Sequence, residues 1–164
     1  MMKFLVDAML GKLAKELRML GYDAAYYRGQ DAHELIQLAR QQERVILTRH
    51  KELTRNTEKD RVIQIEEEKP SLQLKELLDR SVIALNEASL FSRCLLCNFP
   101  LDEMTTEEVE GKVPEFIFYQ ENEFYACPQC HRIYWPGSHL EKMEKRLKAL
   151  ISTQRVKDPS NQAK

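Results

Sequence analysis

Four cysteines constrain this chain more than any other feature, because they form two Cys-x-x-Cys pairs that account for every thiol present. The pairs are Cys94/Cys97 and Cys127/Cys130. Each pair can close a tight turn around a metal ion, and two turns together supply four thiolates in a tetrahedron. The spacing fits the paired-turn zinc pattern except for a longer segment between the pairs. We therefore predict one structural zinc ion bound by all four cysteines.

Two disulfides or a redox pair are the alternatives for the same four thiols. Disulfides are typical of secreted chains. The N-terminus has no apolar core of signal-peptide length, since Asp7 soon follows the apolar residues around Phe4. No apolar run approaches the length that spans a bilayer. We expect a cytoplasmic protein without a membrane partner, and a reducing compartment favours zinc over disulfides.

The composition is typical of a globular protein, with 43% hydrophobic and 31% charged residues. A length of 164 residues fits one medium domain or two small ones. The net charge of −1 neither favours nor excludes a nucleic-acid partner, because only a local patch needs to be basic. The charges are unevenly distributed: residues 102–123 contain eight acids and one base, whereas residues 132–157 contain seven bases and two acids.

The first part of the chain alternates between strand and helix patterns. Apolar runs predict strands at 3–6, 23–27, 44–48 and 61–65, and helical periodicity predicts helices at 10–20, 31–39 and 71–85. Gly21 supplies a helix stop, Asp31 an N-cap with Glu34 three residues later, and Pro70 a helix start. This alternation predicts an α/β domain with a parallel sheet flanked by helices, and an active site at the carboxyl ends of its strands.

The alternation stops at about residues 86–92, where the first cysteine turn begins. We place a domain boundary there, with an α/β domain at 1–88, a zinc ribbon plus C-terminal helix at 89–151 and a flexible tail at 152–164. Within the ribbon, residues 113–119 and 123–126 have strand-like compositions. An apolar stripe on a basic background predicts the last helix, from 138 to about 151.

Two aspartates are expected at the carboxyl ends of the parallel strands, which is the edge of such a sheet where ligands bind. Asp7 ends the first predicted strand, and Asp31 follows the second strand on the same edge of the sheet. Two carboxylates on one rim can hold Mg²⁺ or Mn²⁺, which prefer oxygen ligands and bridge to phosphates. A plain helix N-cap explains Asp31 as well, and a solvated strand end explains Asp7.

Several segments of the chain carry a resemblance to a known family. They are residues 4–14, 20–24, 44–49, 92–98 and 134–139, which read FLVDAMLGKLA, LGYDA, RVILTR, SRCLLCN and YWPGSH. In this order they resemble the Mut-seven C-terminal ribonuclease domain family, which joins a PIN-like nuclease domain to a zinc ribbon. The resemblance runs from about residue 3 to 150. It implies cleavage of RNA at a Mg²⁺ or Mn²⁺ site.

The resemblance also implies roles for individual residues. Asp7 and Asp31 match acidic positions of the family and would be catalytic ligands of the metal ion. The third acid is replaced, because the chain has Thr48-Arg49-His50 where the family has Thr-Arg-Asp. His50 can bind a divalent ion through a neutral nitrogen but adds no negative charge, which suits zinc, nickel or manganese better than magnesium.

Glu52 and Asp60 are nearby carboxylates that could complete the site instead of His50. Loss of one carboxylate weakens a Mg²⁺ site or removes catalysis, so the alternative is a non-catalytic RNA-binding or adaptor protein that has lost its full acidic site. A zinc-dependent protein-interaction module is a third hypothesis. The acidic segment 102–123 favours it, because this segment would repel a phosphate backbone.

Further side chains are candidates for binding single-stranded RNA. They are Lys12, Arg49, Lys51, Ser71, Arg132 and Trp135. The basic residues could bind phosphates, Ser71 could offer a hydroxyl at a helix N-terminus, and Trp135 could stack on a base. Each has a structural alternative, which is a solvated surface for the bases, a helix cap for Ser71 and packing between the ribbon and the last helix for Trp135.

Overall fold

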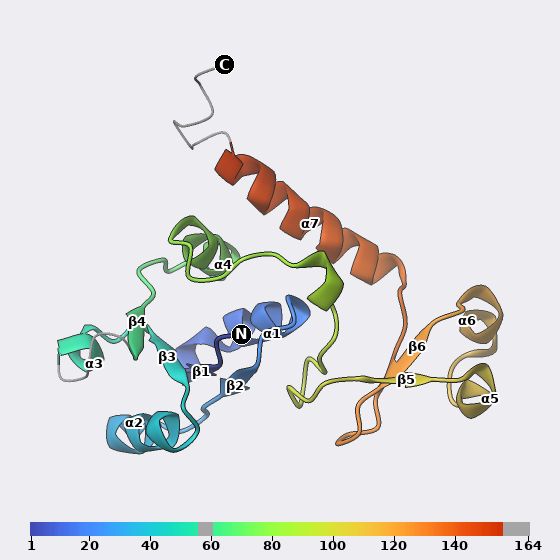
Figure 1. Ribbon diagram of the computed structural model, residues 1–164, viewed down its shortest axis with the longest axis horizontal. Helices are drawn as coiled ribbons and strands as arrows, with labels where there is room; N and C mark the ends of the chain where they lie inside the picture. The colour runs from blue at the N-terminus through green and yellow to red at the C-terminus, as the bar shows by residue number, and fades with distance from the viewer. Residues whose placement is uncertain (56–60, 156–164) are drawn as a thin grey trace. The chain divides into compact units, whose positions relative to one another are not determined.

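The computed structural model of the chain describes residues 1–55 and 61–155 (Figure 1). The chain separates into two compact units, Met1–Pro100 and Leu101–Lys164. The first cysteine pair lies within the first unit, although the sequence places it in a ribbon domain that begins at residue 89. The assignment of domains to 1–88 and 89–151 therefore stays a prediction.

A four-stranded sheet forms the centre of the first unit. Its strands are β1 (Phe4–Val6), β2 (Ala24–Tyr26), β3 (Val45–Thr48) and β4 (Val62–Gln64). They are all parallel and lie in the order β2-β1-β3-β4. The predicted parallel sheet is confirmed, and each strand lies inside the range that its apolar run predicts.

Helices flank this sheet on both sides (Figure 1). They are α1 (Gly11–Met19), which continues the 3-10 turn η1 (Ala8–Leu10), then α2 (Ala32–Gln41), α3 (Lys51–Arg55) and α4 (Pro70–Asp79). Helices α1 and α4 pack against each other on one face of the sheet, and α2 covers the other face. The short helix α3 was not predicted.

Helix α4 ends earlier than its apolar pattern predicts. The pattern extends to residue 85, but the helix ends at Asp79, and Ser81 adopts a left-handed conformation with φ 56°. A left-handed residue cannot continue a right-handed helix. Ile83, beyond the helix end, is nevertheless buried, so the apolar periodicity reflects burial rather than helix at this point.

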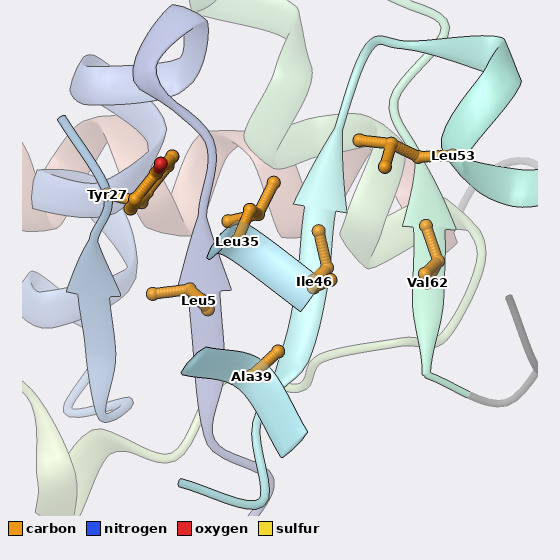
Figure 2. Close-up of a cluster of buried hydrophobic side chains, with 7 residues drawn as sticks. All are labelled: Leu5, Tyr27, Leu35, Ala39, Ile46, Leu53 and Val62. Carbon is orange, nitrogen blue, oxygen red and sulfur yellow. The ribbon is translucent and has the colours of Figure 1, made fainter. Parts of the chain in front are cut away.

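One row of aliphatic side chains crosses the sheet and forms the core beneath α2. Leu5, Ile46 and Val62 stand opposite each other on β1, β3 and β4. Figure 2 shows Leu35 and Ala39 of α2 against this row, and all five side chains are buried. Burial of such a side chain contributes about 1.5–3 kcal/mol. The core thus fixes the register that aligns the carboxyl ends of the strands.

The second unit contains a small antiparallel sheet, as the ribbon prediction requires. Its strands are β5 (Asp102–Met104), β6 (Phe124–Ala126) and β7 (Ile133–Tyr134), in the order β5-β6-β7. Three helices accompany them, which are α5 (Thr106–Val109), α6 (Glu115–Gln120) and α7 (Ser138–Arg155). This sheet and its helices confirm the predicted ribbon with a C-terminal helix.

Two expectations for the second unit are corrected. Residues 115–120 form helix α6 rather than part of a strand, because Pro114 precedes the helix and Glu115 stands in its first turn, both favourable at a helix N-terminus. Helix α7 continues to Arg155, beyond the predicted end near 151. The rest of the predicted tail, 156–164, lies outside the described residues.

None of the described helices has the length and hydropathy needed to cross a bilayer.

The aliphatic row provides a test of the fold. Ile46 is 2% exposed, and Ile46→Ala should lower the free energy of unfolding by about 2–5 kcal/mol, because it removes buried methyl groups and leaves a cavity. Urea unfolding followed by far-ultraviolet circular dichroism measures this change. The control is Met9→Ala, at a side chain that is 61% exposed, which should change stability by less than about 0.5 kcal/mol. Equal effects of the two substitutions would contradict the assigned core.

Candidate metal centre and active site

The first cysteine turn is closed by main-chain hydrogen bonds. The Asn98 amide donates to the Cys94 carbonyl at 2.9 Å, and the Cys94 amide donates to the Phe99 carbonyl at 2.8 Å. The Cys97 amide lies 3.4 Å from the Cys94 sulfur. Asn98 adopts a left-handed conformation with φ 68°, which asparagine tolerates better than most residues.

The second cysteine turn repeats this geometry. The His131 amide donates to the Cys127 carbonyl at 2.9 Å, and the Cys127 amide donates to the Arg132 carbonyl at 3.0 Å. The Cys130 amide lies 3.5 Å from the Cys127 sulfur, and His131 has a φ of 62°. Each turn thus directs one amide N–H group at a cysteine sulfur, which stabilises a thiolate ligand.

The four cysteine sulfurs form one group. All of them lie within 4.8 Å of one another. Sulfurs that bind one zinc ion at about 2.3 Å in a tetrahedron lie about 3.8 Å apart, so this donor set fits zinc. Among the residues whose side chains are described, this is the only group of three or more potential ligands with such spacing. Four thiolates would leave no open position for water, so a zinc ion bound here would have a structural role.

Asp7 follows the central strand β1 and is held on both carboxylate oxygens. Its Oδ1 accepts a hydrogen bond from the Ala8 amide at 2.7 Å, and its Oδ2 accepts one from the Thr48 hydroxyl at 2.7 Å. Its own amide donates to the Leu47 carbonyl of β3. Asp7 is 6% exposed, so it is not the solvated strand end that the sequence left open.

His50 lies beside Asp7, just beyond the end of β3. Its Nε2 is 3.6 Å from Asp7 Oδ2, and its amide donates to the Thr48 hydroxyl oxygen at 3.1 Å. The imidazole is largely exposed, whereas Thr48 is fully buried. Strand order reverses between β1 and β3, and this is where open α/β sheets bind their ligands.

Asp31 serves as the N-cap of α2. Its Oδ1 accepts hydrogen bonds from the amides of His33 and Glu34 at 2.8 and 3.4 Å, and the residue is exposed. The Glu34 carboxylate accepts from the Tyr27 hydroxyl at 2.7 Å, and this bond raises the pKa of Tyr27. The capping function is therefore present, whereas Asp31 does not join Asp7 and His50 in a group of three ligands among the described residues.

Asp7 and His50 provide an oxygen and a nitrogen donor for a divalent ion. Mg²⁺ in phosphate-processing sites is often held by one or two carboxylates plus substrate phosphates, and Mn²⁺ accepts both oxygen and imidazole nitrogen. The pair fits such a two-ligand site. Of the other carboxylates considered, Glu52 is exposed on α3, and Asp60 lies outside the described residues.

The predicted phosphate-binding residues of the first unit differ in their surroundings. Lys12, Lys51 and Ser71 are exposed in the first turns of α1, α3 and α4. The Arg49 guanidinium instead donates to the Glu67 carbonyl at 3.2 Å and lies 3.6 Å from the Glu68 carboxylate. Arg49 therefore holds the segment that follows β4.

The two ribbon candidates also differ. Arg132 is exposed, while its main-chain carbonyl closes the second cysteine turn. Trp135 is half-buried, with its ring centroid 6.5 Å from that of the buried Phe124. Trp135 therefore lies against a core residue of the ribbon, and its stacking on RNA stays a prediction.

Sequence reasoning missed two residues that this region depends on. Thr48 was noted within a motif but not as a site residue, although it bonds both Asp7 and His50. Arg18 was not noted, and it is 6% exposed on α1. Its burial lowers its pKa, while the nearby sulfurs of Cys94 and Cys97 act in the opposite direction. The sequence offers one indication of this burial, because Arg18 lies directly beside the apolar positions of α1.

The comparison with protein families identifies the chain. A family model of the Mut7-C RNAse domain matches residues 2–147. The chain belongs to the Mut7-C RNase domain family. The comparisons with curated proteins and with solved structures found no match.

Membership in the Mut7-C family confirms the resemblance found in the sequence and indicates a nuclease-type function with RNA as the substrate. The match covers both the parallel sheet with Asp7 and His50 and the four-cysteine group. A Mut7-C chain with this geometry thus combines a candidate reaction centre with a group that could bind zinc.

The cysteine group predicts that this Mut7-C chain binds one zinc ion. Cys94→Ser or Cys127→Ser removes a thiolate ligand, and the zinc content measured by native mass spectrometry should fall well below one ion per chain. Ser92→Ala, just before the first turn, is the control and should leave the content unchanged. A metal-free wild-type chain whose mass has lost four thiol hydrogens would instead indicate two disulfides.

Proposed function

We propose that the protein is a divalent-metal-dependent ribonuclease that hydrolyses phosphodiester bonds of single-stranded RNA in the cytoplasm. Its reaction centre lies at the carboxyl ends of β1 and β3. The observation that carries the proposal is the contact of Asp7 with Thr48 and His50 at the strand-order reversal, in a chain of an RNase domain family.

The Asp7 carboxylate is the fixed ligand of this centre. The Ala8 amide and the Thr48 hydroxyl each hold one of its oxygens, so its orientation requires no rearrangement when substrate binds. Each oxygen retains a lone pair for a metal ion, because a carboxylate has about four acceptor sites. A bound Mg²⁺ or Mn²⁺ ion would lower the pKa of a water molecule and stabilise charge on the leaving oxygen.

His50 is proposed as the second group of the centre. Its Nε2 faces Asp7 Oδ2, and its main chain is fixed by Thr48. A neutral imidazole there can be a metal ligand or can accept a proton from the attacking water at Nε2. Asp31 is the weaker candidate for a second carboxylate ligand, because its Oδ1 caps α2.

Lys12 and Lys51 are the proposed contacts to RNA phosphates nearest the reaction centre. Both are exposed, and their helices begin shortly after Asp7 and directly after His50. Lysine ammonium groups neutralise phosphate charge without reading sequence. Further contacts from Arg49, Ser71, Arg132 and Trp135 remain predictions, and the surroundings of Arg49 and Trp135 make them the weaker candidates.

A non-catalytic RNA-binding or adaptor protein is the second candidate function. The observation that favours it is the incomplete acidic site, because no group of three acidic or histidine ligands forms around Asp7 in the described part of the chain. Such a protein would bind single-stranded RNA without cleaving it in Mg²⁺ or Mn²⁺, which separates it from the nuclease.

The role of Asp7 is tested by Asp7→Asn. The substitution keeps the shape of the side chain but removes its charge, and RNA cleavage in Mn²⁺ should fall by about 100-fold or more, since metal-assisted chemistry contributes several kcal/mol. Gel analysis of a labelled single-stranded RNA measures the rate, and circular dichroism verifies the fold. Cleavage at the wild-type rate by a folded Asp7→Asn variant would overturn the proposed centre.

Asp31→Asn is the matched control for this test. Asparagine caps a helix as well as aspartate does, so the substitution removes a charge and retains the cap. We expect a smaller loss of activity than for Asp7→Asn, because Asp31 stands outside the Asp7–His50 contact. An equal loss would instead assign Asp31 as a metal ligand.

The choice of metal is tested at His50. His50→Asp places a second carboxylate beside Asp7 and should raise the ratio of Mg²⁺-supported to Mn²⁺-supported cleavage, because Mg²⁺ prefers oxygen ligands. Initial rates in each metal give this ratio. His33→Ala, at an exposed histidine on α2, should leave it unchanged. An unaltered ratio in His50→Asp would show that residue 50 is not near the ion.

A further inference from the structure

Arg18 is a buried cation that the proposed reaction does not use. It lies near the end of α1 and is 6% exposed. Its Nε donates to the Ala24 carbonyl at 2.8 Å, and its Nη1 donates to the carbonyls of Leu95 and Leu96 at 2.6 and 3.2 Å. A buried guanidinium is costly unless its donors are bonded and its charge is balanced. These three acceptors are neutral, so they bond the Nε and Nη1 donors but do not balance the charge.

The location of two acceptors connects Arg18 with the metal centre. Leu95 and Leu96 are the two residues between Cys94 and Cys97, so the guanidinium binds the backbone of the first Cys-x-x-Cys turn. One zinc ion with four thiolates carries two net negative charges. Arg18 bonds the backbone between the two cysteines, so its positive charge and the negative charge of the thiolates of this turn attract each other.

Asn98 attaches the same turn to the sheet independently. Its Oδ1 accepts from the Ala24 amide at 3.0 Å, and its Nδ2 donates to Asp23 Oδ1 at 2.6 Å. Burial raises the pKa of Asp23, but hydrogen bonds from Arg44 and Asn98 hold it below its ordinary value. On the edge strand β2, the Ala24 amide thus donates to the Asn98 side chain, and the Ala24 carbonyl accepts from the Arg18 side chain.

We propose that Arg18 is the positioning residue of the first cysteine turn. It holds the carbonyls of Leu95 and Leu96 so that Cys94 and Cys97 are preorganised for zinc, and its charge offsets that of the metal-bound thiolates. The proposal rests on the four-cysteine site and is independent of the nuclease activity. Residues that support metal ligands in this way typically contribute 10- to 100-fold to metal affinity.

The test measures zinc release to a chromophoric chelator from the full-length, zinc-loaded protein, without RNA. Arg18→Gln removes the positive charge and the planar set of guanidinium N–H donors. Zinc should then dissociate about 10- to 100-fold faster than from the wild type. Arg18→Lys keeps the positive charge but not the planar set of donors, and it should give an intermediate rate of zinc release. Arg80→Gln is the control, because Arg80 is exposed and bonds the Gln64 carbonyl and Glu76 of the helix α4 that it follows, so zinc release should be unchanged.

Circular dichroism establishes that each variant is folded before release is measured. Wild-type release rates in folded Arg18→Gln or Arg18→Lys would overturn the proposal. Hydrogen exchange on the wild type gives a second readout that requires no variant. The Ala24 amide donates a hydrogen bond to Asn98 Oδ1, so removal of zinc should speed hydrogen exchange at this amide. An unaltered exchange rate would show that the first cysteine turn and the edge of the sheet are not coupled.

Discussion

The parallel pairing of β1 with β3 is the constraint on which the candidate reaction centre depends. These strands are far apart in sequence, and their register places Asp7 against the carboxyl end of β3. The Thr48 hydroxyl then bonds Asp7, and the main chain beyond it places His50 at the same edge. Because the register is held by buried aliphatic side chains, the stability of the core and the geometry of the centre have the same origin.

Buried polar side chains occur at both candidate sites of the first unit. Asp7 and Thr48 satisfy each other at the end of the central strands, and Arg18 is satisfied by carbonyls near the edge strand. Each such group is costly to bury alone and stabilising only as part of a complete set of hydrogen bonds. Their hydrogen bonds allow these polar side chains to be buried beside the hydrophobic core.

The first cysteine turn also protects an edge of the parallel sheet. Strand β2 is an edge strand, and edge strands with unbonded main-chain groups promote association with other chains. Arg18 and Asn98 bond the outward carbonyl and amide of Ala24, and the turn covers them. The zinc-type turn is therefore part of the architecture of the first unit, rather than only the start of a separate ribbon.

The sequence by itself determined the alternation of strands and helices, the four-cysteine group and the position of Asp7 at a strand end, because these follow from local periodicity and ligand spacing. Local pattern was insufficient where burial and backbone conformation compete, so residues 113–119 and the end of α4 were predicted incorrectly. The family resemblance groups His50 with Asp7, but only the tertiary structure shows their contact through Thr48 and the contact of Arg18 with the first cysteine turn. These contacts join residues distant in sequence, and strand register and helix packing alone decide which of them meet.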